Sequence, residues 1–333
     1  MKPLNADFRT GSGIDSLVES MSFTEQGELD VSELRNRLET GGFKFEDLRV
    51  TPSPGASLLA VDSSFSMREL SYHAIWATHA VALYGEYDGG ENDDILVGHG
   101  SIPYGNLLYS SYLEAGEFIP YSEVDSRGNA ARVSFEFSSL KRAYGELESS
   151  GLKPDFILVD GSLYTNLRNI RAKDGVFPEC EAALRSFGEV LGMERVVGMV
   201  EDSHATDLSR DLGYNFTNML LFEIALEPGE YVVDEREGIS ICYVKMPSKP
   251  LPFSAAGSSK PLTVRWEFNY PGFRDDLGLL AGIWMSESDI LHPQIYMLRT
   301  ADYLTRKIRV QGLLERIVSE KGLGLKYREQ REI

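Results

Sequence analysis

Short apolar runs alternate with segments of helical periodicity through the middle of the chain. Each of three runs is bounded by turn residues, which is typical of a strand buried on both faces. These runs lie at residues 57–61, 156–159 and 196–200. Apolar residues at helical spacing predict three helices, over roughly 137–149, 162–172 and 179–191. Strands separated by helices in this way indicate an α/β fold.

The first fifty residues are expected to form a helical lead-in. Asp30 can cap a helix that Gly41 and Gly42 end, with Leu34 and Leu38 on its apolar face. The cluster of Pro and Gly at residues 52–55 then breaks the chain. The sequence therefore predicts a lead-in over 1–50 and a single large domain over 51–333.

The remaining segments add antiparallel strands and C-terminal helices to this plan. A strand is expected over 73–84 beside the first run, and an alternating strand over 262–268. Strands are also expected within 216–246, a helix near 204–212, and helix from 275 to the end. Turns, loops or irregular structure are expected over the segments 85–94, 95–130 and 247–261. The expected fold is thus a mixed sheet flanked by helices, with helical N- and C-terminal extensions.

Two of the predicted strands end in an aspartate that small residues follow. These are Val61-Asp62-Ser63-Ser64 and Val159-Asp160-Gly161-Ser162. Carboxylates on rigid neighbouring strands can share divalent cations, which prefer hard oxygen ligands. The alternative is that each aspartate only caps the helix that follows it.

A site for two ions needs a third carboxylate, and Glu136 is the preferred candidate. If a helix begins early, Glu136 lies one turn before Leu140 on its packed face. If residues 132–137 form a strand instead, Glu136 points away from the apolar side chains around it. The competing residues Glu146 and Glu148 are expected on the solvated face of the helix.

Two residues near the C-terminus are further candidates. Asp302 would add a metal ligand from the last helices, and its alternative is an ordinary carboxylate on a helix surface. His292, before Pro293, is a minor catalytic candidate. The five histidines lack the HExxH spacing of zinc hydrolases. The chain also lacks a P-loop, a GxGxxG fingerprint and the GxSxG elbow of serine hydrolases.

Charge is unevenly distributed along the chain. Lys and Arg number 33 against 51 Asp and Glu, a formal charge of −18, which excludes a polycation that coats nucleic acid. It does not exclude a nuclease, whose metal ligands are acidic. Residues 299–333 carry nine basic and five acidic residues, or +4. Arg306, Lys307 and Arg309 could therefore bind a phosphate backbone, unless this segment is simply a solvated helix pair.

Two cysteines, Cys180 and Cys242, cannot form a disulfide framework, and a reducing cytoplasm is the simplest setting for them. The N-terminus lacks the apolar core of a signal peptide. No stretch approaches the ~20 apolar residues of a membrane span, so no membrane association is expected.

Taken in order, these motifs resemble the NurA nucleases of archaeal and bacterial DNA-end processing. The resemblance runs from about residue 57 to 310. The motifs that carry it are Ala60-Val61-Asp62-Ser63-Ser64, Ile157-Leu158-Val159-Asp160-Gly161-Ser162-Leu163, Val196-Val197-Gly198-Met199-Val200, Leu226-Glu227-Pro228-Gly229-Glu230-Tyr231, Val264-Arg265-Trp266-Glu267-Phe268 and the late helix with Leu298, Ala301 and Asp302.

The resemblance implies a ribonuclease-H-like core and a manganese-dependent nuclease, with magnesium as a possible substitute. It implies 5′→3′ exonuclease and single-strand endonuclease activity in resection at DNA double-strand breaks. It also implies a homodimer that works with a hexameric HerA-type translocase. Asp62 and Asp160 match the metal-binding aspartates of the family, and Glu136 is matched to the intervening glutamate.

Two positions depart from the family pattern. Glu201 stands where a lysine is common after the third strand, and Asp302 stands where a histidine is common. His292-Pro293 is the nearest equivalent of a Tyr-Pro pair. These departures support an alternative function, that of a catalytically impaired dimeric adaptor that docks the translocase.

Overall fold

The computed structural model describes residues 30–51, 55–70, 73–87, 104–201, 203–248, 262–287, 292–307 and 310–320. The chain divides into two compact units, Met1–Lys44 and Phe45–Ile333. In the first unit, the Asp30 side chain accepts hydrogen bonds from the backbone N–H groups of Ser32 and Glu33, and helix α2 (Val31–Thr40) ends at Gly41. The helix expected after Asp30 is therefore confirmed. Residues 1–29 of the expected lead-in lie outside the described residues.

The described strands of the second unit form one nine-stranded mixed sheet. In chain order they are β1 (Glu46–Asp47), β2 (Ala56–Leu70), β3 (His73–Tyr87), β4 (Tyr104–Pro120), β5 (Phe156–Asp160), β6 (Val196–Val200), β7 (Glu230–Arg236), β8 (Ile239–Lys245) and β9 (Thr263–Phe268). Their spatial order is β1-β7-β8-β9-β6-β5-β2-β3-β4. The central β6, β5 and β2 run parallel, and the other pairs are antiparallel. The α/β mixed sheet that the sequence predicts is confirmed, and nothing in the described strands conflicts with a ribonuclease-H-like arrangement.

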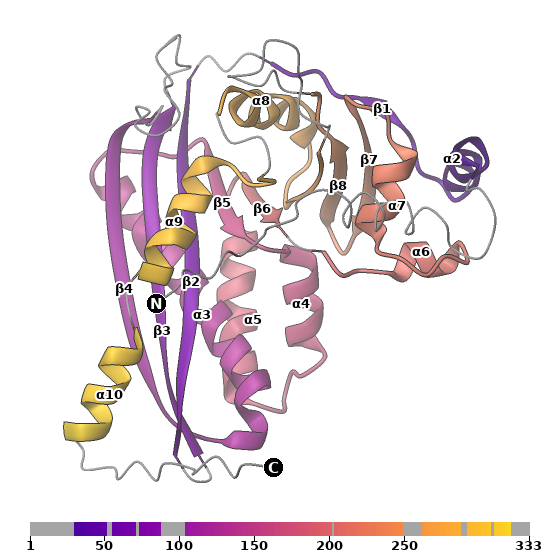
Figure 1. The fold of residues 1–333 in the computed structure, drawn as a ribbon. Helices are drawn as coiled ribbons and strands as arrows, with labels where there is room; N and C mark the ends of the chain where they lie inside the picture. The colour runs from indigo at the N-terminus through magenta and orange to yellow at the C-terminus, as the bar shows by residue number, and fades with distance from the viewer. Residues whose placement is uncertain are drawn as a thin grey trace, which may run out of the picture. The chain divides into compact units, whose positions relative to one another are not determined.

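Helices flank this sheet, as expected. In the second unit they are the short 3-10 helix η1 (Tyr121–Glu123), α3 (Val124–Ser149), α4 (Leu163–Arg171), α5 (Pro178–Leu191), α6 (Asp207–Asp211), α7 (Asn218–Ala225), α8 (Phe273–Ser286), α9 (Tyr296–Lys307) and α10 (Val310–Glu320). Figure 1 shows α9 in front of β2 and β3 and α3 behind them, and both helices contact these two strands. No described helix is long and apolar enough to cross a membrane.

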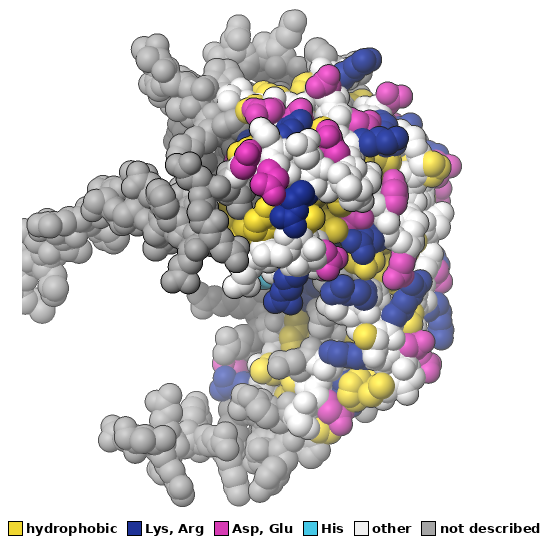
Figure 2. Space-filling view, turned by 90° about the vertical axis from the view of Figure 1, so that its right-hand side faces the viewer, with side chains coloured by type: hydrophobic (Ala, Val, Ile, Leu, Met, Phe, Trp, Pro, Cys, Tyr) yellow, Lys and Arg dark blue, Asp and Glu magenta, His cyan; other side chains and the backbone are white. Residues whose placement is uncertain are grey.

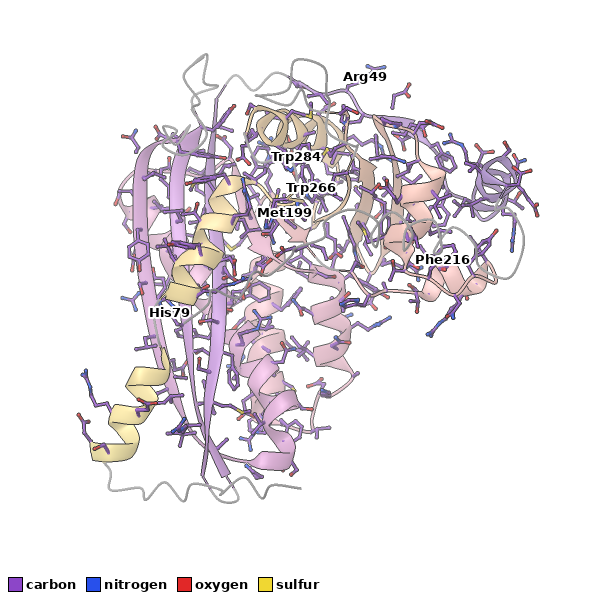
Figure 3. The ribbon with its side chains drawn as sticks, viewed as in Figure 1. Arg49, His79, Met199, Phe216, Trp266 and Trp284 are labelled. Carbon is purple, nitrogen blue, oxygen red and sulfur yellow. The ribbon has the colours of Figure 1, made fainter. Side chains whose placement is uncertain are left out.

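The main hydrophobic core joins the parallel strands to the C-terminal helices. Alternate residues of β2, such as Leu58 and Ala60, pack in one buried cluster with residues of α8 and α9. Met199, Trp266 and Trp284 belong to the same cluster and lie together near α8 in Figure 3. The C-terminal helices are thus held against the sheet by continuous apolar packing.

Residues 95–130, expected to be irregular, form regular structure wherever they are described. Strand β4 pairs with β3 along the edge of the sheet, but Leu107, Leu108 and Tyr109 are all exposed, so no alternation of buried side chains marked the strand. Helix α3 begins at Val124, far before the expected start near 137. Gly128 is a poor helix former, but its backbone packs tightly against the Phe65 ring, and this tertiary contact extends the helix.

Strand β2 also exceeds the expectation. The sequence predicts a strand that ends at Asp62, whereas β2 continues to Leu70 because it pairs with β3 along its whole length. Asp62 is therefore within a strand and not at its end. Only the parallel pairing with β5 stops at this point, with Val61 opposite Val159.

The C-terminal third agrees with most expectations and corrects one. Strands β7 and β8 form the hairpin expected around Glu237-Gly238, both of which have positive φ. Residues 218–225, expected within strands, are instead helix α7, which the Thr217 side chain caps. Strand β9 and helices α8, α9 and α10 lie where strand and helix were expected. The segments 249–261 and 321–333 lie outside the described residues.

Candidate metal centre

The two aspartates singled out by the sequence lie on adjacent parallel strands. The register places Val61 of β2 opposite Val159 of β5, so the next residues along the two strands are Asp62 and Asp160. Strand β5 ends at Asp160, and the small Gly161 follows with positive φ. Both carboxylates are therefore fixed by rigid backbone where the two strands part.

Two side chains from the C-terminal region bind these aspartates. Thr305 of α9 donates a hydrogen bond from Oγ1 to Oδ2 of Asp62 over 2.6 Å. Gln294, which precedes α9, donates from Nε2 to Oδ1 of Asp160 and to the Met199 carbonyl. Helix α9 thus covers one side of the site, and Asp62 is only 3% exposed.

Glu136 reaches the site from α3, which settles the alternative left open by the sequence in favour of a helix. It is 2% exposed and accepts hydrogen bonds from Ser63 Oγ and, over 2.8 Å, from Arg132 Nη1. Its rivals Glu146 and Glu148 are exposed, as expected, and Glu146 pairs with nearby Arg142.

Burial and mutual repulsion perturb all three carboxylates. Desolvation, with added repulsion from Glu136 and Asp160, raises the pKa of Asp62 to about 8. Desolvation also raises the pKa of Glu136, to about 7, against the opposing attraction of Arg132. The pKa of Asp160 is raised, first by burial and further by repulsion from Asp302 and Glu201. Concentrated negative charge of this kind is disfavoured unless protons or a cation neutralise it.

The donor set is of the type that a hard divalent cation prefers, because it consists of carboxylates from two adjacent strands and a neighbouring helix that influence one another electrostatically. Within the part of the chain that the structure describes, no three Asp, Glu, His or Cys side chains already form a group that could hold a metal ion. Protein donors occupy the carboxylates instead: Thr305 on Asp62, Gln294 on Asp160, and Ser63 on Glu136. A bound cation would therefore replace some of these hydrogen bonds.

The other predicted site residues lie at the rim or outside the described part. Asp302 is near enough to Asp160 to raise its pKa by charge repulsion. Asp302 also forms a 2.6 Å ion pair with Arg306. The His292 imidazole Nε2 lies 3.4 Å from a carboxylate oxygen of Glu201. Lys307 is the last residue of α9, while Arg309 lies outside the described residues. The roles assigned to these residues remain predictions.

The polar residues that hold the carboxylates were not among the predicted site residues. Arg132 had a local signal, because it precedes Glu136 by four residues and such pairs meet on a helix. Thr305 and Gln294 had none, since their partners are distant in the sequence. Only the packing of α9 against the sheet brings them to Asp62 and Asp160.

Comparison with known proteins decides the family. A family model described as the NurA domain matches residues 56–266, which include β2 through most of β9 and the carboxylates of Asp62, Glu136 and Asp160. The chain belongs to the NurA family. A comparison of this NurA protein with curated proteins finds no match.

Solved NurA structures share its fold. The crystal structure of the NurA nuclease from Sulfolobus solfataricus is 13% identical in sequence and has a TM-score of 0.55. The alignment covers 94% of this chain and 98% of the chain in that structure. A crystal structure of NurA bound to dAMP and manganese is also 13% identical, with a TM-score of 0.53. That alignment covers 92% of this chain and 94% of the chain in that structure. At this level of identity the likeness shows the fold alone.

Proposed function

We propose that this NurA protein is a divalent-metal-dependent deoxyribonuclease that hydrolyses phosphodiester bonds. The observation that carries the proposal is the adjacency of Asp62 and Asp160, with buried Glu136 close enough to raise the pKa of Asp62. Two comparisons support it, since one similar structure is a NurA nuclease and another holds dAMP and manganese.

The residues that would hold Mn²⁺, or Mg²⁺ in its place, are Asp62, Asp160 and Glu136, with Asp302 as a fourth donor. When bound, such an ion activates water and offsets the charge on phosphate oxygens. Arg132 favours the ionised form of the Glu136 carboxylate by pairing with it, and so partly offsets the effect of burial. Thr305 and Gln294 orient the two aspartates. His292 would exchange a proton with the leaving group or with solvent.

The finer activity follows the family resemblance. We assign this protein 5′→3′ exonuclease and single-strand endonuclease activity in resection at DNA double-strand breaks. Its partner would be a hexameric HerA-type translocase, and its setting the cytoplasm, where Cys180 and Cys242 stay reduced as the free thiols of the structure. Arg306, Lys307 and Arg309 would bind the DNA backbone beside α9.

A homodimer is also part of the proposal. The edge strand β4 supports it, because Leu107, Leu108, Tyr109 and Leu113 are between 43% and 50% exposed. Among the described strands β4 pairs only with β3, and a sheet edge with exposed apolar side chains favours association with another strand. A second copy of this chain offers the same edge. Light scattering of the wild type and of Leu108→Lys tests this assignment, since the charge should shift the population towards monomer.

The adaptor alternative rests on a different observation. Glu201 stands where a lysine is common in the family. It lies beside His292 and adds negative charge near Asp160. Acidic residues at this position would weaken binding of a phosphate group. An adaptor of this kind would keep the fold and the dimer but cleave no DNA.

Cleavage of labelled single-stranded DNA by wild type and Asp62→Asn separates the two functions. The substitution removes a ligand charge while preserving volume, so we expect Mn²⁺-dependent cleavage to fall by at least about a hundredfold with the fold intact. Asp174→Asn, the same change at an exposed residue, should cleave like wild type. Full activity of Asp62→Asn would refute the site, and an inactive wild type that still dimerises would favour the adaptor.

A further inference from the structure

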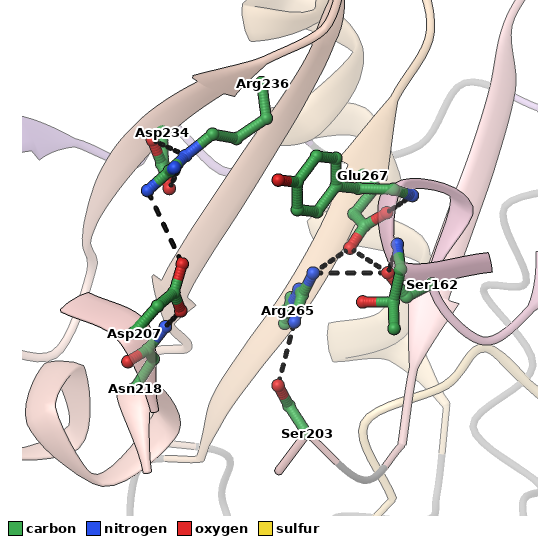
Figure 4. Close-up of polar contacts among 10 residues, drawn as sticks. Ser162, Ser203, Asp207, Asn218, Asp234, Arg236, Arg265 and Glu267 are labelled. Atoms are coloured by element: carbon green, nitrogen blue, oxygen red, sulfur yellow. Dashed lines mark hydrogen bonds and ion pairs between the residues drawn. The ribbon is translucent and has the colours of Figure 1, made fainter. Parts of the chain in front are cut away.

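A polar cavity lies close in sequence to Asp160 but is lined by none of the three carboxylates. Its volume is about 260 Å³, and its lining comes from α4, α6, α7, β7, β8, β9 and the segment before α6. Figure 4 shows its polar contacts around Arg265 and Arg236. Arg265 reaches Ser162, which follows Asp160 by two residues and so lies at most ~7 Å from it between Cα atoms.

The floor of this cavity contains a buried guanidinium group. Arg265 is only 3% exposed, and its Nη2 forms an ion pair with Glu267 over 2.5 Å. Nη1 donates to Ser203 Oγ over 2.8 Å, and Nη2 also donates to Ser162 Oγ over 3.2 Å. Its Nε has no hydrogen-bond partner among the described residues. Solvent does not reach this atom, so Arg265 faces the cavity through the rest of its side chain.

The rim carries positive charge that the protein leaves uncompensated. Arg236 is neutralised, because its Nε donates to both carboxylate oxygens of Asp234 at 2.9 Å and its Nη2 lies 3.7 Å from Asp207. Arg168 and Arg210 are exposed, and no carboxylate of the described residues pairs with either. Arg168 instead lies over the Tyr164 ring. The cavity therefore has two arginines available for an anion.

This cation excess contrasts with the acidic character of the chain. The formal charge is −18, yet Figure 2 shows Lys and Arg side chains scattered between Asp and Glu over the face on the side of α4 and α6. Arginine binds phosphate through planar, charge-assisted hydrogen bonds. A phosphate monoester carries about −1.5 to −2 at neutral pH, which matches the two unpaired arginines better than the single charge of a phosphodiester.

We propose that this cavity, which we call the arginine pocket, binds the terminal phosphate of a nucleic-acid strand or of a mononucleotide. Arg168 and Arg210 bind the dianion at the rim, above the Arg265 side chain on the floor. For a strand as the source, the inference rests on the proposed nuclease function, because the strand would continue from here toward Asp160. The affinity of the pocket for a phosphate monoester is independent of cleavage.

Fluorescence anisotropy in EDTA tests the pocket without cleavage, so a failed nuclease assay and a failed pocket are distinguishable. The probes are labelled single-stranded 12-mers with a 5′-phosphate, a 3′-phosphate or only hydroxyl ends, with dAMP and inorganic phosphate as competitors. We expect one phosphorylated 12-mer to bind wild type about tenfold more tightly than the hydroxyl form, since charge-assisted contacts to phosphate are strong. Competition by dAMP at similar concentration would identify the mononucleotide as a source, and its failure would identify the strand end.

Variants locate the binding to the arginine pocket. Arg168→Gln and Arg210→Gln, both at exposed positions, should each remove most of the preference for a terminal phosphate. Arg185→Gln, which removes the same charge from the exposed face of α5, should retain it. Arg265→Lys keeps the charge of the floor but loses the hydrogen bonds to Ser162 and Ser203, and should weaken the preference if circular dichroism shows an intact fold. Equal binding of all three 12-mers to wild type, or equal loss in Arg185→Gln, would overturn the proposal.

Discussion

The Thr305 hydroxyl donates a 2.6 Å hydrogen bond to Oδ2 of Asp62 across 243 residues of sequence. The same hydroxyl is 2.7 Å from the Asp302 carbonyl, which fixes it within the last turn of α9. This bond lowers the pKa of Asp62 and partly opposes the effect of burial and of neighbouring carboxylates. Thr305 is thus a positioning residue that helps keep an aspartate ionised.

Removing this hydroxyl should shift the pH dependence of the reaction. Thr305→Val deletes the hydrogen bond, so the pKa of Asp62 rises further and less of it is ionised near neutral pH. We expect Mn²⁺-dependent cleavage to fall about three- to tenfold at pH 7, as a lost hydrogen bond to a charged group predicts, and to recover toward pH 9. A pH–rate profile from 6 to 9.5 measures this. Thr300 on the same helix donates its hydroxyl to the Tyr296 carbonyl, away from the carboxylates, so Thr300→Val should leave the profile unchanged.

The metal-free protein should lose stability as the pH rises. The raised pKa values of Asp62 and Glu136, about 8 and about 7, mean that the folded state binds protons which the unfolded state has already released. The free energy of unfolding therefore falls between about pH 5 and 8, by an amount on the order of a few kcal/mol. Urea unfolding in EDTA at several pH values measures this slope. Asp62→Asn should flatten it, and a wild-type stability that rises over this range would contradict the electrostatics of the site.

Metal should stabilise the fold by relieving the same repulsion. Asp302 adds to the negative charge around Asp160, so Asp302→Ala should reduce the rise in melting temperature that Mn²⁺ causes, and raise the metal-free melting temperature slightly. Asp302→His, the residue type common in the family, should retain part of the activity. Arg306→Ala controls for loss of the Asp302–Arg306 ion pair. If Mn²⁺ raises the melting temperature of Asp302→Ala as much as that of wild type, Asp302 lies outside the metal site.

The basic residues after Asp302 should contribute to DNA binding. Replacing Arg306, Lys307 and Arg309 together with Gln should weaken binding to single-stranded DNA and flatten its salt dependence, because each phosphate contact releases counterions. Arg306 is 72% exposed at its side chain, so it is accessible despite its pairing with Asp302. Binding measured from 50 to 300 mM salt gives the slope. An unchanged slope would show that these residues contact no phosphate and belong only to a solvated helix.

The sequence by itself determined the elements whose pattern is local. A run such as Phe156–Val159 is buried on both faces, so its apolar continuity marks a strand wherever it packs. Asp160 at its end, and the apolar spacing of α4 and α5, follow from the same local pattern. The ordered series of motifs also identified the family, which the match over 56–266 confirms.

Only the tertiary structure decided the partners of the carboxylates. Helix α3 extends back to Val124 because Gly128 meets the Phe65 ring, and strand β4 forms because β3 offers an edge. The bond from Gln294 to Asp160, and the pocket around Arg265, join residues that are more than a hundred positions apart. A local pattern records which face of an element is buried, but not which distant side chain meets it. That choice depends on how the helices and strands pack, because a hydrogen bond between them is worth little until packing has fixed both groups.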